Sequence, residues 1–131
     1  MNLRGLGFSV GILLALPVAA FAQWGFEGRW YGIGHEHPTR PGVETDYPIS
    51  ISLYGPDGSI DYPSLRCSGT LRRISGGDPS LVRFQEHITS GDCVRGGEIT
   101  LTMVQGTLSF TWHGRDDEGT FITVVAVLNR N

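Results

Sequence analysis

Alternation of apolar and polar residues with a period of two recurs through most of the chain after Gln23, and no segment shows a helical period. A β-strand places successive side chains on opposite faces, so this alternation predicts half-buried strands. Turn residues separate the predicted strands, which cover residues 26–33, 49–54, 59–62, 68–74, 82–89, 99–103, 108–112 and 121–128. The last of these is apolar on both faces, so we expect both of its faces to be covered.

Short connections between eight short strands leave no room for crossover helices and indicate an antiparallel meander. Closing such a sheet removes its exposed edges. The sequence therefore predicts an all-β fold, a small antiparallel up-and-down barrel of about eight strands; a two-sheet β-sandwich is the alternative. The interior of a barrel of this size either fills with side chains or holds one small ligand.

The first 22 residues have the order of regions typical of a secretory signal peptide. Arg4 precedes an apolar run from Leu6 to Val18, and Ala20-Phe21-Ala22 follows as an A-x-A cleavage site. A transmembrane anchor would need about 20 apolar residues, and this run is shorter. We expect a signal peptide over residues 1–22, one barrel domain over residues 23–131 with no membrane span, and a periplasmic or secreted protein.

The charge composition excludes some partners. The chain has a net charge of −3, and all of its basic residues are arginines. A weakly acidic surface argues against nucleic acid and anionic membranes as main partners. No sequence feature indicates a cofactor.

Cys67 and Cys93 are the only cysteines. In an oxidising compartment, two cysteines in a small domain most simply form one disulfide. A catalytic thiol or a metal pair is the alternative, but a nucleophilic cysteine needs a base and a zinc site needs four ligands. Neither cysteine has the local spacing that those sites require, so a structural disulfide is predicted.

Two stretches resemble known families. Gly28-Arg29-Trp30 together with Arg130 resembles the calycin barrels, which include lipocalins and avidins and in which a Gly-x-Trp on the first strand packs beneath a basic side chain from the last. Residues 61–71 (DYPSLRCSGTL) and 84–97 (FQEHITSGDCVRGG), followed by Leu101-Thr102, resemble a small extracytoplasmic domain appended to some actinobacterial serine/threonine protein kinases. This second resemblance covers roughly residues 28–113 of a chain that carries no kinase. It implies an exported β-domain with a disulfide, for which ligand sensing is one expectation, and it carries over no catalytic residue.

Glu86 is the most informative candidate site residue, because alternation points its carboxylate to the same side as Phe84 and Ile88. A buried carboxylate must be paired or protonated. It is either a ligand anchor inside the barrel or a structural partner of a tyrosine or of Arg66, Arg95 or Arg130. The other candidate ligand-binding residues are Tyr54, Tyr62 and Arg66; Trp30 and Trp112 are expected to be core.

Two further groups of polar residues can be interpreted either as functional sites or as ordinary surface and turn residues. His35 and His37 share a face of an extended segment, near Glu44 and Asp46, and could bind zinc or copper. A solvated polar cluster is the alternative and is preferred, so no metal site is predicted. Asp57, Asp61, Asp116 and Asp117 could serve as acid and base, but aspartates are common in turns.

Three hypotheses of function follow. The first is an exported non-enzymatic binding module of the bacterial envelope, which recognises a small ligand, an envelope polymer or a protein partner; an inhibitor of a cell-wall hydrolase is one version. The second is a small secreted hydrolase that uses Glu86 or the turn aspartates. The third is a structural envelope protein without a discrete ligand.

Overall fold

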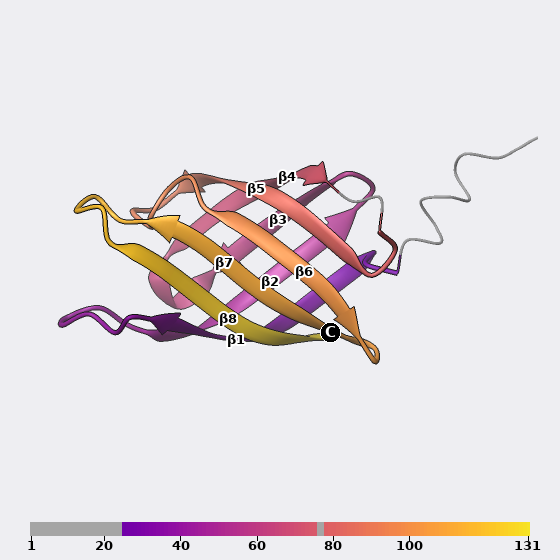
Figure 1. Cartoon of the computed structure of the whole chain (residues 1–131), viewed down its shortest axis with the longest axis horizontal. Helices are drawn as coiled ribbons and strands as arrows, with labels where there is room; N and C mark the ends of the chain where they lie inside the picture. The colour runs from indigo at the N-terminus through magenta and orange to yellow at the C-terminus, as the bar shows by residue number, and fades with distance from the viewer. Residues whose placement is uncertain (1–24, 76–77) are drawn as a thin grey trace, which may run out of the picture.

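The computed structural model describes residues 25–75 and 78–131. Eight antiparallel strands form a closed barrel in which each strand pairs with the next and β1 pairs with β8 (Figure 1). The predicted all-β fold and eight-stranded antiparallel barrel are thus confirmed, and the sandwich alternative does not occur. The strands are β1 (Gly28–His37), β2 (Asp46–Tyr54), β3 (Asp57–Tyr62), β4 (Cys67–Ser75), β5 (Leu81–Ser90), β6 (Glu98–Val104), β7 (Thr107–Arg115) and β8 (Phe121–Arg130); a short 3-10 turn, η1 (Pro63–Leu65), follows β3.

The predicted signal peptide and the glycines at positions 76 and 77 lie outside the described residues. Among the residues that are described, no helix is long and apolar enough to cross a membrane.

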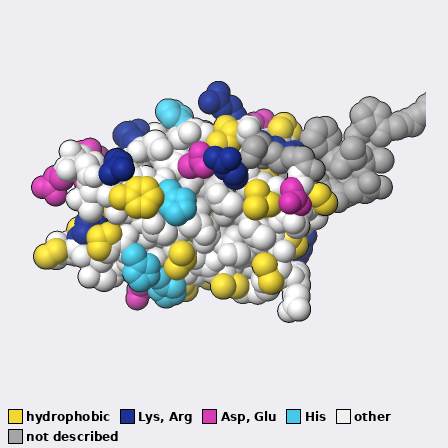
Figure 2. Space-filling view, in the orientation of Figure 1, with side chains coloured by type: hydrophobic (Ala, Val, Ile, Leu, Met, Phe, Trp, Pro, Cys, Tyr) yellow, Lys and Arg dark blue, Asp and Glu magenta, His cyan; other side chains and the backbone are white. Residues whose placement is uncertain are grey.

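One face of each strand supplies the core. On β2, for example, Ile49 and Ile51 are fully buried while Ser50 and Ser52 between them are partly exposed. The expectation that both faces of the last strand are covered is wrong. Phe121 and Val127 of β8 are 51% and 61% exposed, because a single-layer barrel covers only the inward face of a strand. In Figure 2, hydrophobic side chains on the visible face are scattered among polar ones.

One end of the barrel, here called the closed end, is sealed around Trp30. This fully buried side chain donates a hydrogen bond from Nε1 to the carbonyl oxygen of Phe26 at 2.9 Å. The guanidinium carbon of Arg130 lies 4.2 Å from the centre of the Trp30 ring, and its nitrogens donate to the carbonyl oxygens of Glu27 and Gly25. Arg130 is therefore a packed lid over the tryptophan.

The opposite end, here called the open end, is surrounded by the connections at residues 38–45, 63–66, 91–97 and 116–120. The loops that follow β1 and β7 project from the left of Figure 1, while the β6–β7 turn and the C-terminus lie at the right. The Tyr62-Pro63 step belongs to the open end, where η1 carries the chain from β3 to β4. These connections come from four different parts of the chain, so the open end brings loop residues that are distant in sequence close together. Loops held in this way by a rigid scaffold often carry binding residues.

Candidate functional site

A cavity of about 340 Å³ enters the barrel at the open end. Inward residues of seven strands line it, together with Leu65 of η1 and residues of the 38–45 and 91–97 loops. The volume is at the small end of the range of about 300–1,000 Å³ that is usual for ligand pockets. The barrel interior is thus filled at the closed end and open at the other.

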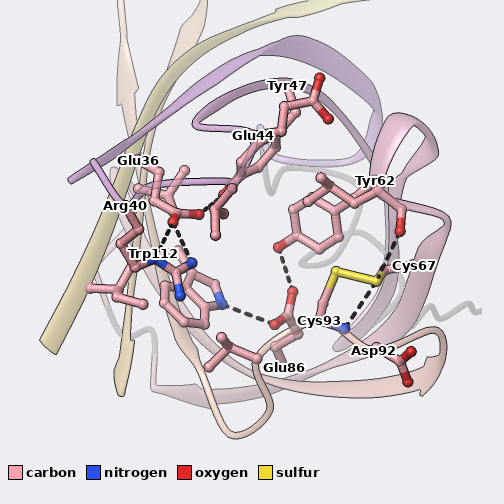
Figure 3. Close-up of a pocket in the computed structure, with 15 residues that line it drawn as sticks. Glu36, Arg40, Glu44, Tyr47, Tyr62, Cys67, Glu86, Asp92, Cys93 and Trp112 are labelled. Carbon is pink, nitrogen blue, oxygen red and sulfur yellow. Dashed lines mark hydrogen bonds and ion pairs between the residues drawn. A yellow bond between two sulfur atoms is a disulfide. The ribbon is translucent and has the colours of Figure 1, made fainter. Parts of the chain in front are cut away.

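Glu86 of β5 points into this cavity, as strand alternation predicts, and is only 3% exposed. Its carboxylate accepts one hydrogen bond from the Tyr62 hydroxyl at 2.5 Å and one from Trp112 Nε1 at 2.9 Å. Figure 3 shows both side chains directed at the carboxylate from either side. The tyrosine alternative for its partner is correct.

The three arginines considered as partners of Glu86 lie elsewhere. Arg95 donates to the carbonyl oxygens of Ile88 and Gly91, and Arg130 covers the closed end. Arg66 is exposed and ends η1 in a left-handed conformation, with φ 57°. Among the described residues, no arginine or histidine forms an ion pair with Glu86, so its charge meets only neutral donors.

Burial raises the pKa of Glu86, because the protein interior disfavours the ionised form; the hydrogen bonds from Tyr62 and Trp112 act in the opposite direction. The pKa of Tyr62 is raised well above its usual range, first by burial and then by the negative charge and hydrogen bond of Glu86. Tyr62 therefore keeps its proton and remains a donor to the carboxylate.

A second carboxylate, Glu36 of β1, is 7% exposed and lines the same cavity. It accepts a hydrogen bond from the Tyr47 hydroxyl at 2.8 Å and two from Arg40, through Nε at 3.1 Å and Nη2 at 2.5 Å. Arg40 also reaches Asp116 of the 116–120 loop, at 3.5 Å. Burial and the neighbouring Glu36 raise the pKa of Tyr47, so this tyrosine is also a permanent donor.

The sequence interpretation missed the roles of Glu36, Arg40 and Tyr47. The signal for two of them was present, because Glu36 continues the inward series of β1 beyond Trp30, and Tyr47 precedes the inward Ile49 of β2. Arg40 carried no such signal, since it lies in a proline-containing loop.

Trp112 holds its position because two glycines leave room for its ring. A Cβ atom on Gly97 would lie 2.1 Å from the indole, and one on Gly114 would lie 2.4 Å from it. Only glycine permits so close an approach of the backbone. The indole N–H is thereby held toward Glu86, and Trp112 is both core, as expected, and part of the cavity wall.

The predicted disulfide between Cys67 and Cys93 is confirmed, with a Cα–Cα distance of 6.1 Å. It joins the start of β4 to the 91–97 loop and forms part of the cavity wall. A disulfide of this kind is consistent with an oxidising, extracytoplasmic compartment.

The structure brings together only part of the predicted site. Glu86 and Tyr62 meet in the cavity, whereas Tyr54 and Arg66 are exposed and do not line it. Tyr54 ends β2 at the opposite end of the barrel.

The two groups of polar residues singled out in the sequence are also placed. His35 Nδ1 lies 2.9 Å from Asp46 Oδ1 on the outer surface, and the described residues hold no group of three or more side chains suited to a metal ion. Asp116 Oδ1 accepts backbone N–H bonds from Glu118 and Thr120 and so shapes its own loop. Asp57 and Asp61 are exposed on β3, and Asp117 is exposed beside Asp116.

Comparison with protein-family models and with curated protein sequences finds no match to this chain.

Proposed function

We propose that this chain is an exported, non-catalytic binding module that holds a small ligand in the open end of its barrel. The observation that carries the proposal is the cavity of about 340 Å³, which combines apolar walls with buried, hydrogen-bonded carboxylates. Ligand sites are typically concave and mostly apolar, with a few polar groups that fix orientation.

Binding explains this lining better than catalysis does. None of the described lining residues is a serine, threonine, histidine or lysine, and both cysteines in the wall are joined in a disulfide. The deeper carboxylates, Glu36 and Glu86, are held by tyrosine, arginine and tryptophan donors. Groups fixed in this way hold a bound molecule in one orientation.

Export rests on two features that agree. Residues 1–22 have the pattern of a secretory signal peptide, and the Cys67–Cys93 disulfide suits an oxidising compartment. A small ligand is preferred to an envelope polymer or a protein as the binding partner, because the cavity has the volume of a pocket for a small molecule.

The test uses binding of the neutral dye N-phenyl-1-naphthylamine, whose fluorescence rises in an apolar site. Val94 lies half-buried in the loop at the mouth of the cavity, so Val94→Trp should block entry. Val104→Trp is the matched control, because Val104 is 49% exposed at the end of β6 by the β6–β7 turn, away from the cavity.

We expect saturable dye fluorescence from the wild-type protein and from Val104→Trp, and its loss in Val94→Trp. Equal dye binding by both variants, or no saturable binding by the wild type, would overturn the proposal.

A further inference from the structure

If the barrel holds a small ligand, as proposed above, its lining also indicates the class of that ligand. We propose that the ligand is a small organic ammonium compound, whose N–H donors bind the Glu86 carboxylate while its apolar part packs against the cavity wall.

The two buried carboxylates of the cavity differ in the charge of their hydrogen-bond donors. Glu36 has a cationic partner in Arg40, at 2.5 Å. Glu86 is more deeply buried, yet it meets only the neutral donors of Tyr62 and Trp112. A buried carboxylate without a cation is costly. A bound ammonium group would supply the positive charge that Glu86 lacks among its protein neighbours.

Glu86 also retains capacity to accept hydrogen bonds. An ionised carboxylate has about four lone-pair sites, and Tyr62 and Trp112 each occupy one, on different oxygens. The remaining sites belong to a side chain that lines the cavity. A ligand ammonium can therefore bind without displacing either protein donor.

The charges around the cavity favour a cation. Its described lining includes the carboxylates of Glu36, Glu44, Glu86 and Asp92, against the single guanidinium of Arg40. That guanidinium is already engaged by Glu36 and by Asp116 outside the lining. A site lined by one sign of charge concentrates ligands of the other sign and disfavours those of the same sign. An anionic ligand such as a fatty acid would meet repulsion at every depth.

The remaining wall defines the rest of the ligand. Leu65, Val94, Ile122 and Val124, together with the disulfide, supply apolar surface to the lining, and the Tyr62 and Trp112 rings flank Glu86 (Figure 3). This surface suits a compact alkyl or aryl group. The structure therefore assigns the site to an amphipathic amine rather than to a polyamine, which would leave the apolar wall unused.

The test compares probes that share an apolar body and differ in the polar head. Isothermal titration calorimetry of the full-length oxidised protein at neutral pH uses 2-phenylethylamine, 2-phenylethanol and 3-phenylpropanoate, together with hexylamine, hexanol and hexanoate. We expect each amine to bind about tenfold or more tightly than its alcohol, as charge-assisted hydrogen bonds allow, and each carboxylate to bind least.

Glu86→Gln should remove the preference for the amine and leave the alcohols nearly unchanged. Glu98→Gln is the matched control, because Glu98 is a strand carboxylate outside the cavity that pairs with Arg83; this variant should keep the preference. If Glu86→Gln does not fold, nuclear magnetic resonance of the wild-type protein decides. An amine bound at Glu86 must shift the Nε1–H signal of Trp112, which donates to that carboxylate.

Alcohols or carboxylates that bind the wild-type protein as tightly as the amines would overturn the ammonium assignment, while leaving small-ligand binding in place. Tight amine binding that is unchanged in Glu86→Gln, or that does not shift the Trp112 signal, would also overturn it. Failure of all six probes to bind at up to millimolar concentrations would overturn the ammonium assignment too, whereas failure of the neutral dye would overturn the proposed function itself.

Discussion

Replacement of Glu86 by glutamine should change how the stability of the barrel depends on pH. Burial raises the pKa of Glu86 above its ordinary value of 4.5, so between these two pKa values the folded state binds a proton that the unfolded state has released. Stability then falls as pH rises through that window. The contribution of Glu86 is fully present below pH 4.5 and is lost as pH passes the pKa of the folded state.

The magnitude follows from one proton. Within the window the wild-type protein should lose about 1.4 kcal/mol of unfolding free energy per pH unit relative to Glu86→Gln. Glutamine cannot accept hydrogen bonds through its amide nitrogen, so one donor, Tyr62 or Trp112, is poorly satisfied in the variant. That defect should add a pH-independent destabilisation of roughly 1–3 kcal/mol.

Urea denaturation of both proteins at a series of pH values, monitored by circular dichroism, measures the pH-dependent and the pH-independent contributions to the unfolding free energy. The expected result is a variant that is less stable than the wild type in acid, with a gap that narrows as pH rises and is constant beyond the window. Tyr62 does not titrate there, because its own pKa is raised well above the usual range. Glu98→Gln, on the outside of β6, controls for the general effect of removing a negative charge.

A gap that stays constant with pH would refute the reasoning, because it would mean that Glu86 has the same pKa in the folded and unfolded states. A gap that widens with rising pH would refute it more strongly, since it would show that the ionised carboxylate is stabilised on folding.

Two further predictions concern the two ends of the barrel. The double variant Cys67→Ser, Cys93→Ser opens a loop closed across 26 residues, and the chain-entropy relation gives a loss of about 3.5 kcal/mol; urea denaturation should show it, and a midpoint equal to that of the wild type would contradict the structural role. Arg130→Met removes the cation from the Trp30 ring and two hydrogen bonds to backbone carbonyls, at a cost of about 1–3 kcal/mol. Thermal unfolding measures this loss, with Arg115→Met as the control at an exposed aromatic contact; equal effects of the two arginine variants would contradict the role of Arg130 as a lid.

Much of the fold was predictable because a strand has a strict two-residue period. The same alternation that indicated eight strands also placed Glu86 on the inward face, and extending it along β1 and β2 would have placed Glu36 and Tyr47 there too. The two-residue period gave no answer on β8, because apolar residues occupy both of its faces and led to the wrong prediction that both faces are covered. A strand in a single-layer barrel has only one inward face, so Phe121 and Val127 are exposed.

The cysteine pairing was also predictable, since only two cysteines are present and the first 22 residues led us to expect an oxidising compartment. The role of Arg40 was not, because a loop has no period from which the direction of a side chain can be inferred. Its contacts with Glu36 and Asp116 depend on where the loops after β1 and β7 meet.

On the strands whose apolar and polar residues alternate, the sequence by itself determined which side chains face the interior, because that property is local. Only the tertiary structure decided which of them meet. Tyr62 and Trp112 lie 24 and 26 residues from Glu86 in the chain, on β3 and β7, and reach it because strand register and barrel closure bring their inward positions to the open end. The absence of a cationic partner for Glu86 among the described residues has the same origin, since register places the nearby arginines elsewhere.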